Sequence, residues 1–224
     1  SLVFDDLVFN EFFCMRFAEA LGFAVPRVDL VDVGRKALLI QRYDREIDGE
    51  GRIVRVHQED FCQALGIMPD NKYEADGGPG FAAIAATLRR ASANPLRDIQ
   101  AFARISLFNL LVGNCDAHGK NFSLLYKGRE VGLAPFYDLV STAAYPELSD
   151  RFSMRFGGEY RFEKLGRDSL ERFAADLGVR AKLVADAMAA LIESAAAVRA
   201  RVASLPELAE RQGLVGKILD IWDA

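Results

Sequence analysis

Three residues with carboxylate or amide side chains follow one another at a spacing suited to chemistry on phosphates. Asp116 precedes Asn121 by five positions, and Asp138 follows Asn121 by seventeen. Mg²⁺ prefers a few hard oxygen ligands completed by water and substrate phosphates, which suits the Asn121 amide and the Asp138 carboxylate. A carboxylate off the metal, such as that of Asp116, can orient a hydroxyl group and accept its proton. Lys120 could place a positive charge beside a phosphoryl group.

Each of these residues also has an ordinary structural interpretation. An Asp that follows a helix is usually a cap or turn residue. An Asp followed five positions later by an Asn also arises often by chance. The short pattern alone therefore leaves both interpretations open.

The elements predicted around these residues favour the chemical interpretation. An apolar-periodic run that opens at Pro95 predicts a buried helix ending at Gly113. Residues 121–126 and 131–133 predict two short strands joined by a turn. A helix, a loop and a hairpin in this order bring Asp138 back towards the start of the hairpin, as a metal site requires.

A longer pattern in the same region is specific. Residues 112–123, VGNCDAHGKNFS, resemble the pattern G-x-x-D-x-H-x-K-N-F-S of HipA-like kinases, the toxin kinases of bacterial toxin–antitoxin systems. Further segments match in the same order and cover about residues 10 to 160: NEFFC from position 10, QRYDR from 41, HQEDFCQALG from 57, KYEADGGPG from 72, PFYDL from 135 and FSMRFGG from 152.

The resemblance implies an α+β, mainly α fold with protein-kinase-like organisation. Residues 57–224 would form the helical C-terminal lobe, and residues 1–56 would form a remnant of the small lobe with the interlobe segment. It also implies roles for the residues of the first pattern. Asp116 would be the catalytic Asp, Asn121 and Asp138 the Mg²⁺ ligands, and Lys120 a phosphate neighbour.

The resemblance further implies nucleotide contacts. Gln41-Arg42-Tyr43 corresponds to the segment that joins the two lobes, where backbone groups meet the adenine, so Gln41 and Tyr43 are candidate cofactor-binding residues. The family more often has Glu at the position of Gln41, a difference that matters little if the backbone makes the contact. His118 matches the family's His and is counted with the cofactor-binding candidates. For its side chain we favour a structural hydrogen bond that orients the loop over proton transfer.

The implied protein is a cytoplasmic, ATP- and Mg²⁺-dependent serine/threonine kinase of a toxin–antitoxin system. Its implied partners are a protein substrate, such as an aminoacyl-tRNA synthetase or another translation factor, and an antitoxin. DNA would be contacted only indirectly, through the antitoxin, and no membrane contact is expected. Two alternatives stay open: a non-catalytic, partner-binding kinase-like module, and a kinase acting on a small-molecule hydroxyl.

One part of the family pattern is missing. The phosphate-covering loop and a strand lysine lie upstream of the helix that opens near Asn10, and no lysine precedes Lys36. Lys36 falls in a predicted hairpin turn, which makes it a poor replacement. We therefore expect an N-terminally truncated chain, and the sequence leaves the activity of this fragment undecided.

Composition agrees with an ordinary folded domain. The 224 residues are 51% hydrophobic, enough for a sizeable core. A net charge of −4 argues against strong nucleic-acid binding by this chain alone. No apolar run approaches the ~20 residues that span a bilayer. Two histidines argue against a zinc site. We expect Cys14 and Cys62 to be small core residues and Cys115, next to Asp116, to be accessible to alkylation.

The remaining elements can be placed coarsely from periodicity and turn residues. Gly77-Gly78-Pro79-Gly80 is interpreted as a permissive turn rather than a phosphate cradle, because it lacks the lysine and preceding strand of a P-loop. The other expectations are a helix over 6–21, strands over 28–33, 37–43 and 53–56, mainly helices from His57 on, an activation-segment equivalent over 139–150, an alternating strand through Phe152, Met154 and Phe156, and a helical tail from Ser169 broken at Gly178 and Pro206.

Overall fold

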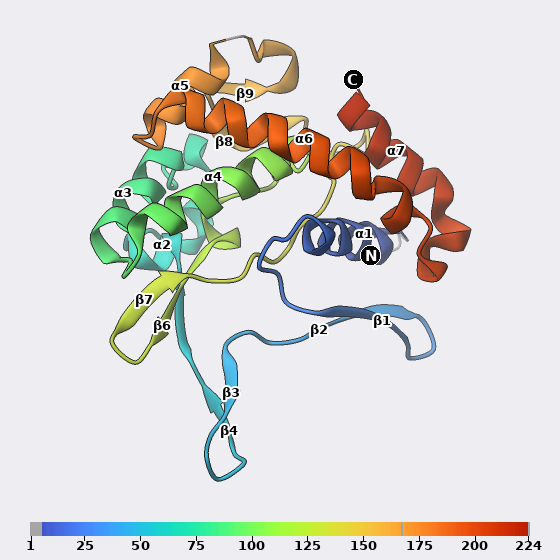
Figure 1. Cartoon of the computed structure of the whole chain (residues 1–224), viewed down its shortest axis with the longest axis horizontal. Helices are drawn as coiled ribbons and strands as arrows, with labels where there is room; N and C mark the ends of the chain where they lie inside the picture. Colours follow the sequence, from blue (N-terminus) through green and yellow to red (C-terminus); the bar gives the residue numbers. More distant parts are fainter. Residues whose placement is uncertain (1–5, 167, 224) are drawn as a thin grey trace.

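A computed structural model describes residues 6–166 and 168–223 (Figure 1). In Figure 1 the longer helices occupy the upper part of the molecule, and the hairpins β1–β2, β3–β4 and β6–β7 extend from its lower side. The helices are α1 (Leu7–Ala20), α2 (Phe61–Ala64), α3 (Phe81–Ala91), α4 (Pro95–Leu111), α5 (Ser169–Asp176), α6 (Ala181–Ala203) and α7 (Gln212–Asp223). The strands are β1 (Val28–Asp32), β2 (Lys36–Ile40), β3 (Arg45–Ile47), β4 (Ile53–Arg55), β5 (His57–Asp60), β6 (Ser123–Lys127), β7 (Glu130–Leu133), β8 (Arg151–Phe156) and β9 (Glu159–Arg161). Five 3₁₀ turns complete the described elements: η1 (Pro69–Asn71), η2 (Glu74–Asp76), η3 (Gly119–Asn121), η4 (Phe162–Lys164) and η5 (Pro206–Arg211). The fold is α+β and mainly helical, as predicted.

Helix α4 lies within the main core and leads directly into the candidate site. Pro95 occupies its first turn, and the Asn94 side chain caps it by accepting a hydrogen bond from the Arg97 N–H at 3.3 Å. Phe102 and Phe108 are fully buried, and each such side chain stabilises the fold by about 1.5–3 kcal/mol. The helix ends before Gly113, whose φ of 70° turns the chain into the loop that carries Asp116.

Helix α1 is buried on most of its surface, including Phe12, Phe13 and Phe17. It packs against α6, α7 and the hairpin β1–β2. Helix α1 and the β1–β2 hairpin therefore share one core with the helical part, whereas the β3–β4 hairpin is exposed. The division at residue 56 stays a prediction.

The sheets are small and antiparallel. Strand β1 pairs with β2, β3 with β4, and β8 with β9, while β5, β6 and β7 form one three-stranded sheet. Two expectations were wrong here. The strand expected over 37–43 ends at Ile40, and a separate strand, β3, begins at Arg45. Residues 57–60 form strand β5 instead of a helix start, because their backbone pairs with β6, sixty-six residues further along the chain.

The outlines of the remaining elements were predicted correctly. The tail is helical, with breaks between α5 and α6 and between α6 and α7 near Gly178 and Pro206. Strand β8 is present, but Ser153 is buried with its apolar neighbours rather than outward-facing. Within the residues that the structure describes, no helix combines the length and apolarity needed to cross a bilayer.

Candidate functional site

Three side chains form hydrogen bonds with the backbone of the loop between α4 and η3. The Asn114 Oδ1 accepts the Asp116 N–H at 3.2 Å, and the Thr142 hydroxyl oxygen accepts the Cys115 N–H at 2.8 Å. The Cys115 carbonyl accepts both the Ser153 N–H at 2.8 Å and its hydroxyl at 2.9 Å. These contacts fix the backbone of Cys115 and the Asp116 N–H, while 49% of the Asp116 side chain stays exposed. The carboxylate is therefore oriented and accessible.

The two candidate metal ligands meet directly. The Asn121 Nδ2 donates a hydrogen bond to the Asp138 Oδ2, and the Asn121 Oδ1 accepts the His118 N–H at 2.9 Å. Asp138 has a φ of 57°, the single positive φ outside glycine in the described residues. Such a backbone costs free energy and persists where the surroundings impose it, which is common at functional sites.

Negative charge accumulates around Asp138. The protein packed around its carboxyl group raises its pKa, and the charge of Asp116 raises it further, while the hydrogen bond from Asn121 lowers it. Burial raises the pKa of Glu11 on α1 to about 7, and Asp138 adds to that shift. Carboxylates from three separate segments thus lie close enough to repel one another.

This donor set fits a magnesium ion shared with phosphates. Asp138 offers a carboxylate, and the Asn121 Oδ1 retains one lone pair after binding the His118 N–H. A divalent cation would offset the repulsion between Asp138 and Asp116. Across residues 6–166 and 168–223, no group of three or more His, Cys, Asp or Glu side chains is arranged to hold a metal. An ion here would therefore take its remaining ligands from water and phosphate oxygens, as Mg²⁺ commonly does.

His118 lies beneath the same loop. Its side chain is 7% exposed, and its Nε2 lies 4.0 Å from the Asp116 Oδ2. Burial lowers its pKa, Asp116 opposes that shift, and the charges of Lys72 and Lys120 add to it. In the described part of the chain its buried Nδ1 has no hydrogen-bond partner. The ring packs edge-on against Tyr73, so its position is set by packing and by its backbone bond to Asn121.

The predicted interlobe segment reaches the site through aromatic stacking. The Tyr43 ring stacks on Tyr137, which precedes Asp138, with ring centroids 5.7 Å apart. The Tyr137 hydroxyl donates to the Lys120 carbonyl at 2.7 Å. Gln41 is exposed, and its N–H donates to the Arg27 carbonyl at 2.9 Å. The structure thus brings Tyr43 next to the metal-ligand candidates and leaves the Gln41 side chain at the surface.

Lys120 affects the site through its backbone carbonyl and through the charge of its side chain. Its carbonyl holds Tyr137, as described above, and its ammonium charge acts on His118 and on Cys62. Asp116, His118, Asn121, Asp138, Tyr43 and Lys120 therefore converge on one region, whereas Gln41 can contribute through its backbone only.

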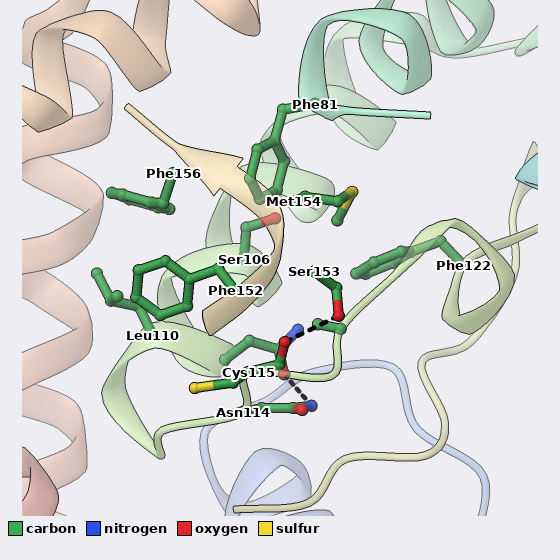
Figure 2. Close-up of a pocket in the computed structure, with 12 residues that line it drawn as sticks. Phe81, Ser106, Leu110, Asn114, Cys115, Phe122, Phe152, Ser153, Met154 and Phe156 are labelled. Atoms are coloured by element: carbon green, nitrogen blue, oxygen red, sulfur yellow. Dashed lines mark hydrogen bonds between the residues drawn. The ribbon is translucent and has the colours of Figure 1, made fainter. Parts of the chain in front are cut away.

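Two cavities border the loop. One of about 530 Å³ opens beside Asp116 and is lined in part by Tyr73, Arg151 and Tyr160. The other, of about 20 Å³, is shown in Figure 2, where the rings of Phe81 and Phe152 and the Met154 side chain surround it. The larger cavity has the size and polarity of an acceptor site, and the smaller one is a packing gap in the core.

The expectation that Cys115 is accessible to alkylation was wrong. Its side chain is buried, at 3% exposure, and lines both cavities from the inside. Burial raises the pKa of its thiol to about 11, which disfavours the reactive thiolate. Cys14 and Cys62 are buried, as expected.

The segment after Asp138 has two parts. Ser141 is fully buried: its N–H donates to the Asn10 Oδ1 at 2.7 Å, and its carbonyl accepts from the Asn10 Nδ2 at 2.9 Å. Residues 146–150, in contrast, are exposed. Only this second part has the accessibility expected of an activation-segment equivalent.

Sequence reasoning missed several residues that build this site. These residues make hydrogen bonds to the backbone of the loop that carries Asp116 and of the segment after Asp138: Asn10, Asn114, Thr142 and Ser153. Their polarity within apolar segments was the available signal, because a buried polar side chain must find a hydrogen-bond partner. Lys72 lies in a segment that matches the family, and its type alone did not single it out.

Comparisons with known proteins identify the family of this chain. The family model of the HipA-like C-terminal domain matches residues 2–199. Putative kinase Y4mE of Sinorhizobium fredii is 45% identical over 194 residues, which are 86% of this chain and 46% of that protein. The serine/threonine-protein kinase toxin HipA of Shewanella oneidensis is 37% identical over 197 residues, 81% of this chain and 45% of HipA. This chain spans about half the length of these curated relatives.

Solved structures show the same likeness. The Shewanella oneidensis HipA in complex with HipB and operator DNA has a TM-score of 0.88 at 33% identity, over 97% of this chain and 55% of that chain. The Helicobacter pylori proinflammatory kinase CtkA has a TM-score of 0.63 at 14% identity, over 97% and 79%, and shows the fold alone. The chain therefore has a kinase-like α+β fold and belongs to the HipA-like C-terminal domain family.

Proposed function

We propose that this chain supplies the catalytic lobe of an ATP-dependent serine/threonine protein kinase of a toxin–antitoxin system. The observation that carries the proposal is the convergence of Asp116, Asn121 and Asp138. Asn121 and Asp138, seventeen residues apart, are hydrogen-bonded to each other, and Asp116 lies close enough to raise the Asp138 pKa. Two oxygen ligands and an accessible carboxylate on separate loops are the groups that phosphoryl transfer requires of a protein.

Each residue has a proposed task. Asp116 orients the acceptor hydroxyl and accepts its proton. Asn121 and Asp138 hold Mg²⁺, which neutralises charge on the phosphates when it is bound. Tyr43 and the backbone at Gln41 border the nucleotide, and His118 fixes the loop between Asp116 and Asn121.

Lys120 is proposed as a cation near the phosphates, because its charge acts on His118 inside the same loop. Residues 1–56 are proposed as the small-lobe remnant and interlobe segment, and residues 57–224 as the helical lobe. In this proposal the first part passes the nucleotide at Gln41, which is exposed.

The proposed partners follow from the relatives. The HipA structure contains HipB and operator DNA, which supports an antitoxin partner for this protein. Contact with DNA is proposed to be only indirect, through that antitoxin. The net charge of −4 is consistent with that indirect contact. A cytoplasmic protein substrate, such as a translation factor of the aminoacyl-tRNA synthetase kind, completes the proposal.

One observation favours a second candidate, a kinase for a small-molecule hydroxyl. The cavity beside Asp116, at about 530 Å³, lies within the range of small-molecule sites. A label-transfer screen with the complete gene product over proteins and metabolites distinguishes the two candidates, because each predicts a different class of labelled product.

Titration calorimetry tests the proposed nucleotide site directly. Mg-ATP and metal-free ATP are titrated into the chain, into the complete gene product and into their Asp138→Asn variants. We expect binding that requires Mg²⁺ and weakens at least about 100-fold in Asp138→Asn, since loss of a ligand costs more than loss of its supporting residues. Absence of Mg²⁺-dependent binding in both wild-type forms would contradict the proposal and favour a non-catalytic partner-binding module.

A further inference from the structure

The glycine-containing segment over residues 72–80 is packed tightly onto the site loop. A Cβ atom on Gly119 would lie 2.3 Å from the Pro79 Cγ, so the segment touches the backbone of η3. A Cβ atom on Gly78 would lie 2.5 Å from the Asn71 carbonyl oxygen. No side chain fits at either position. The expected permissive turn is therefore also a contact surface that fixes the distance between this segment and η3.

An ion pair between the mostly buried Glu74 and the half-exposed Arg155 fixes the other side of the segment. The Glu74 carboxylate accepts the Arg155 N–H at 2.6 Å and its Nε–H at 2.9 Å, and its side chain is 15% exposed. Charge-assisted, bidentate contacts of this kind define orientation well. The residues between Asn71 and Glu74 are thus held between η3 and β8.

The two residues held there are Lys72 and Tyr73, and they extend the site by a continuous series of contacts. The Lys72 Nζ lies over the Tyr73 ring, 4.8 Å from its centroid. The Tyr73 ring packs against the His118 ring with centroids 5.5 Å apart. The His118 Nε2 lies 4.0 Å from the Asp116 Oδ2. Lys72 is thereby oriented by an aromatic ring that also lines the cavity beside Asp116.

Lys72 carries a charge that the described part of the chain does not neutralise. No carboxylate of residues 6–166 and 168–223 lies within ion-pair distance of its ammonium group, although acidic residues surround the site. The Tyr73 ring beneath its ammonium group lines the same cavity as Asp116, so this charge lies beside that cavity. A cation that rests on an aromatic ring of the Asp116 cavity, and that no carboxylate of the described residues neutralises, is placed to bind an anion.

We propose that Lys72 is a further phosphate-binding residue of this site, whose ammonium group binds the terminal phosphoryl group of the nucleotide. The inference rests on the proposed kinase function. In the transfer step the acceptor oxygen bonds to the terminal phosphorus, and the bond from that phosphorus to the bridging oxygen breaks. ADP leaves with the electron pair, and the hydroxyl proton passes to Asp116. Lys72 neutralises negative charge on the oxygens of the group in transit.

The test compares nucleotides that differ by that one phosphoryl group. Mg-ATP and Mg-ADP are titrated calorimetrically into the complete gene product, its Lys72→Met and Lys72→Arg variants, and Lys182→Met as matched control. Lys182 is an exposed lysine on α6 that pairs with Asp186. Thermal unfolding of each variant checks that the fold is intact.

We expect Lys72→Met to weaken Mg-ATP binding about 10-fold and Mg-ADP binding less than 2-fold, with kcat reduced about 100-fold. Lys72→Arg should restore most of the ATP preference, and Lys182→Met should change neither affinity. A folded Lys72→Met variant that loses ATP and ADP affinity equally, or loses neither, overturns the Lys72 inference while the kinase proposal stands. A wild-type protein without Mg²⁺-dependent nucleotide binding overturns both.

Discussion

The two halves of the candidate site are built in different ways. The half that carries Asp116, Asn121 and Asp138 rests on the helical core, and its loops are tied by buried hydrogen bonds from Asn10 and Ser153. The half that would face the nucleotide base consists of two-stranded hairpins with exposed faces. Ile47 and Ile53 in the β3–β4 hairpin are 76% and 74% exposed.

The difference shows which contacts fix the position of each half of the site. A two-stranded hairpin is marginally stable by itself, so its position depends on a few contacts at its base. For this segment those contacts include the Tyr43–Tyr137 stack and the Lys127–Glu46 ion pair with β6. Inside the segment, Asp44 pairs with Arg42 and Arg45. The half that carries Asp116, Asn121 and Asp138, here called the transfer half, needs no such support from the hairpins, because the helical core positions it.

The largest effect is expected in the transfer half. Asp116→Asn in the complete gene product should lower the rate of phosphoryl transfer about 1,000-fold, because the variant cannot accept the hydroxyl proton. Within the described residues the exposed side chain accepts one long hydrogen bond, from the Ser153 hydroxyl at 3.5 Å, and lies 4.0 Å from the His118 Nε2. The melting temperature should therefore stay within about 2 °C of the wild type. Radiolabel transfer and thermal unfolding measure the two quantities. Asp220→Asn, at an exposed position of α7, is the control, and retained phosphorylation in Asp116→Asn would remove the assignment.

A smaller effect tests whether the core holds this half. Asn10→Ala should lower the free energy of unfolding by about 2–4 kcal/mol, because it leaves the buried N–H and carbonyl of Ser141 unpaired. Asn94→Ala, which removes a single capping bond at α4, should cost only about 1 kcal/mol. Denaturant unfolding of both variants measures the difference. Equal losses would mean that the segment after Asp138 is not anchored through α1.

The smallest effect concerns the hairpin half and its pH dependence. Hydrogen bonds from Arg42, with a contribution from Arg45, lower the pKa of the buried Asp44 from 3.8 to about 2, against desolvation. Because the folded pKa is the lower one, the carboxylate stabilises the fold above pH ~4, and this contribution is lost as pH falls towards 2. Asp44→Asn should therefore cost about 1–2 kcal/mol at pH 7, since both partners are partly solvated.

Unfolding of wild type and Asp44→Asn across pH 2 to 7 measures this window. The difference between them should shrink as pH falls from about 4 to about 2. Asp186→Asn, which breaks an exposed pair on α6, should differ from wild type by less than about 0.5 kcal/mol throughout. A pH-independent cost of Asp44→Asn would show that Asp44 acts through packing rather than charge.

Sequence patterns predicted most of the fold and most of the site candidates. The buried helix ending at Gly113, the β6–β7 hairpin and the helical tail depend on local periodicity and turn residues, which tertiary contacts left unchanged. Strand β5 was missed because His57-Gln58-Glu59-Asp60 has no strand-like alternation, and its conformation comes from pairing with β6. The burial of Cys115 was not predicted because it depends on strand β8, which pairs with the Cys115 carbonyl and is distant in the sequence.

What the sequence alone determined is the set of chemical groups and their order along the chain. Asp116, Asn121 and Asp138 carry the oxygen atoms that a phosphate site needs, and their spacing within a family pattern was enough to identify the fold. The tertiary structure decided which groups meet. Asn121 contacts Asp138, Asn10 holds a segment 131 residues away, and the 72–80 segment places Lys72 on the Tyr73 ring, which lines the cavity beside Asp116. These contacts depend on how buried helices and strands pack around a shared core, so they follow from long-range burial rather than from any local pattern.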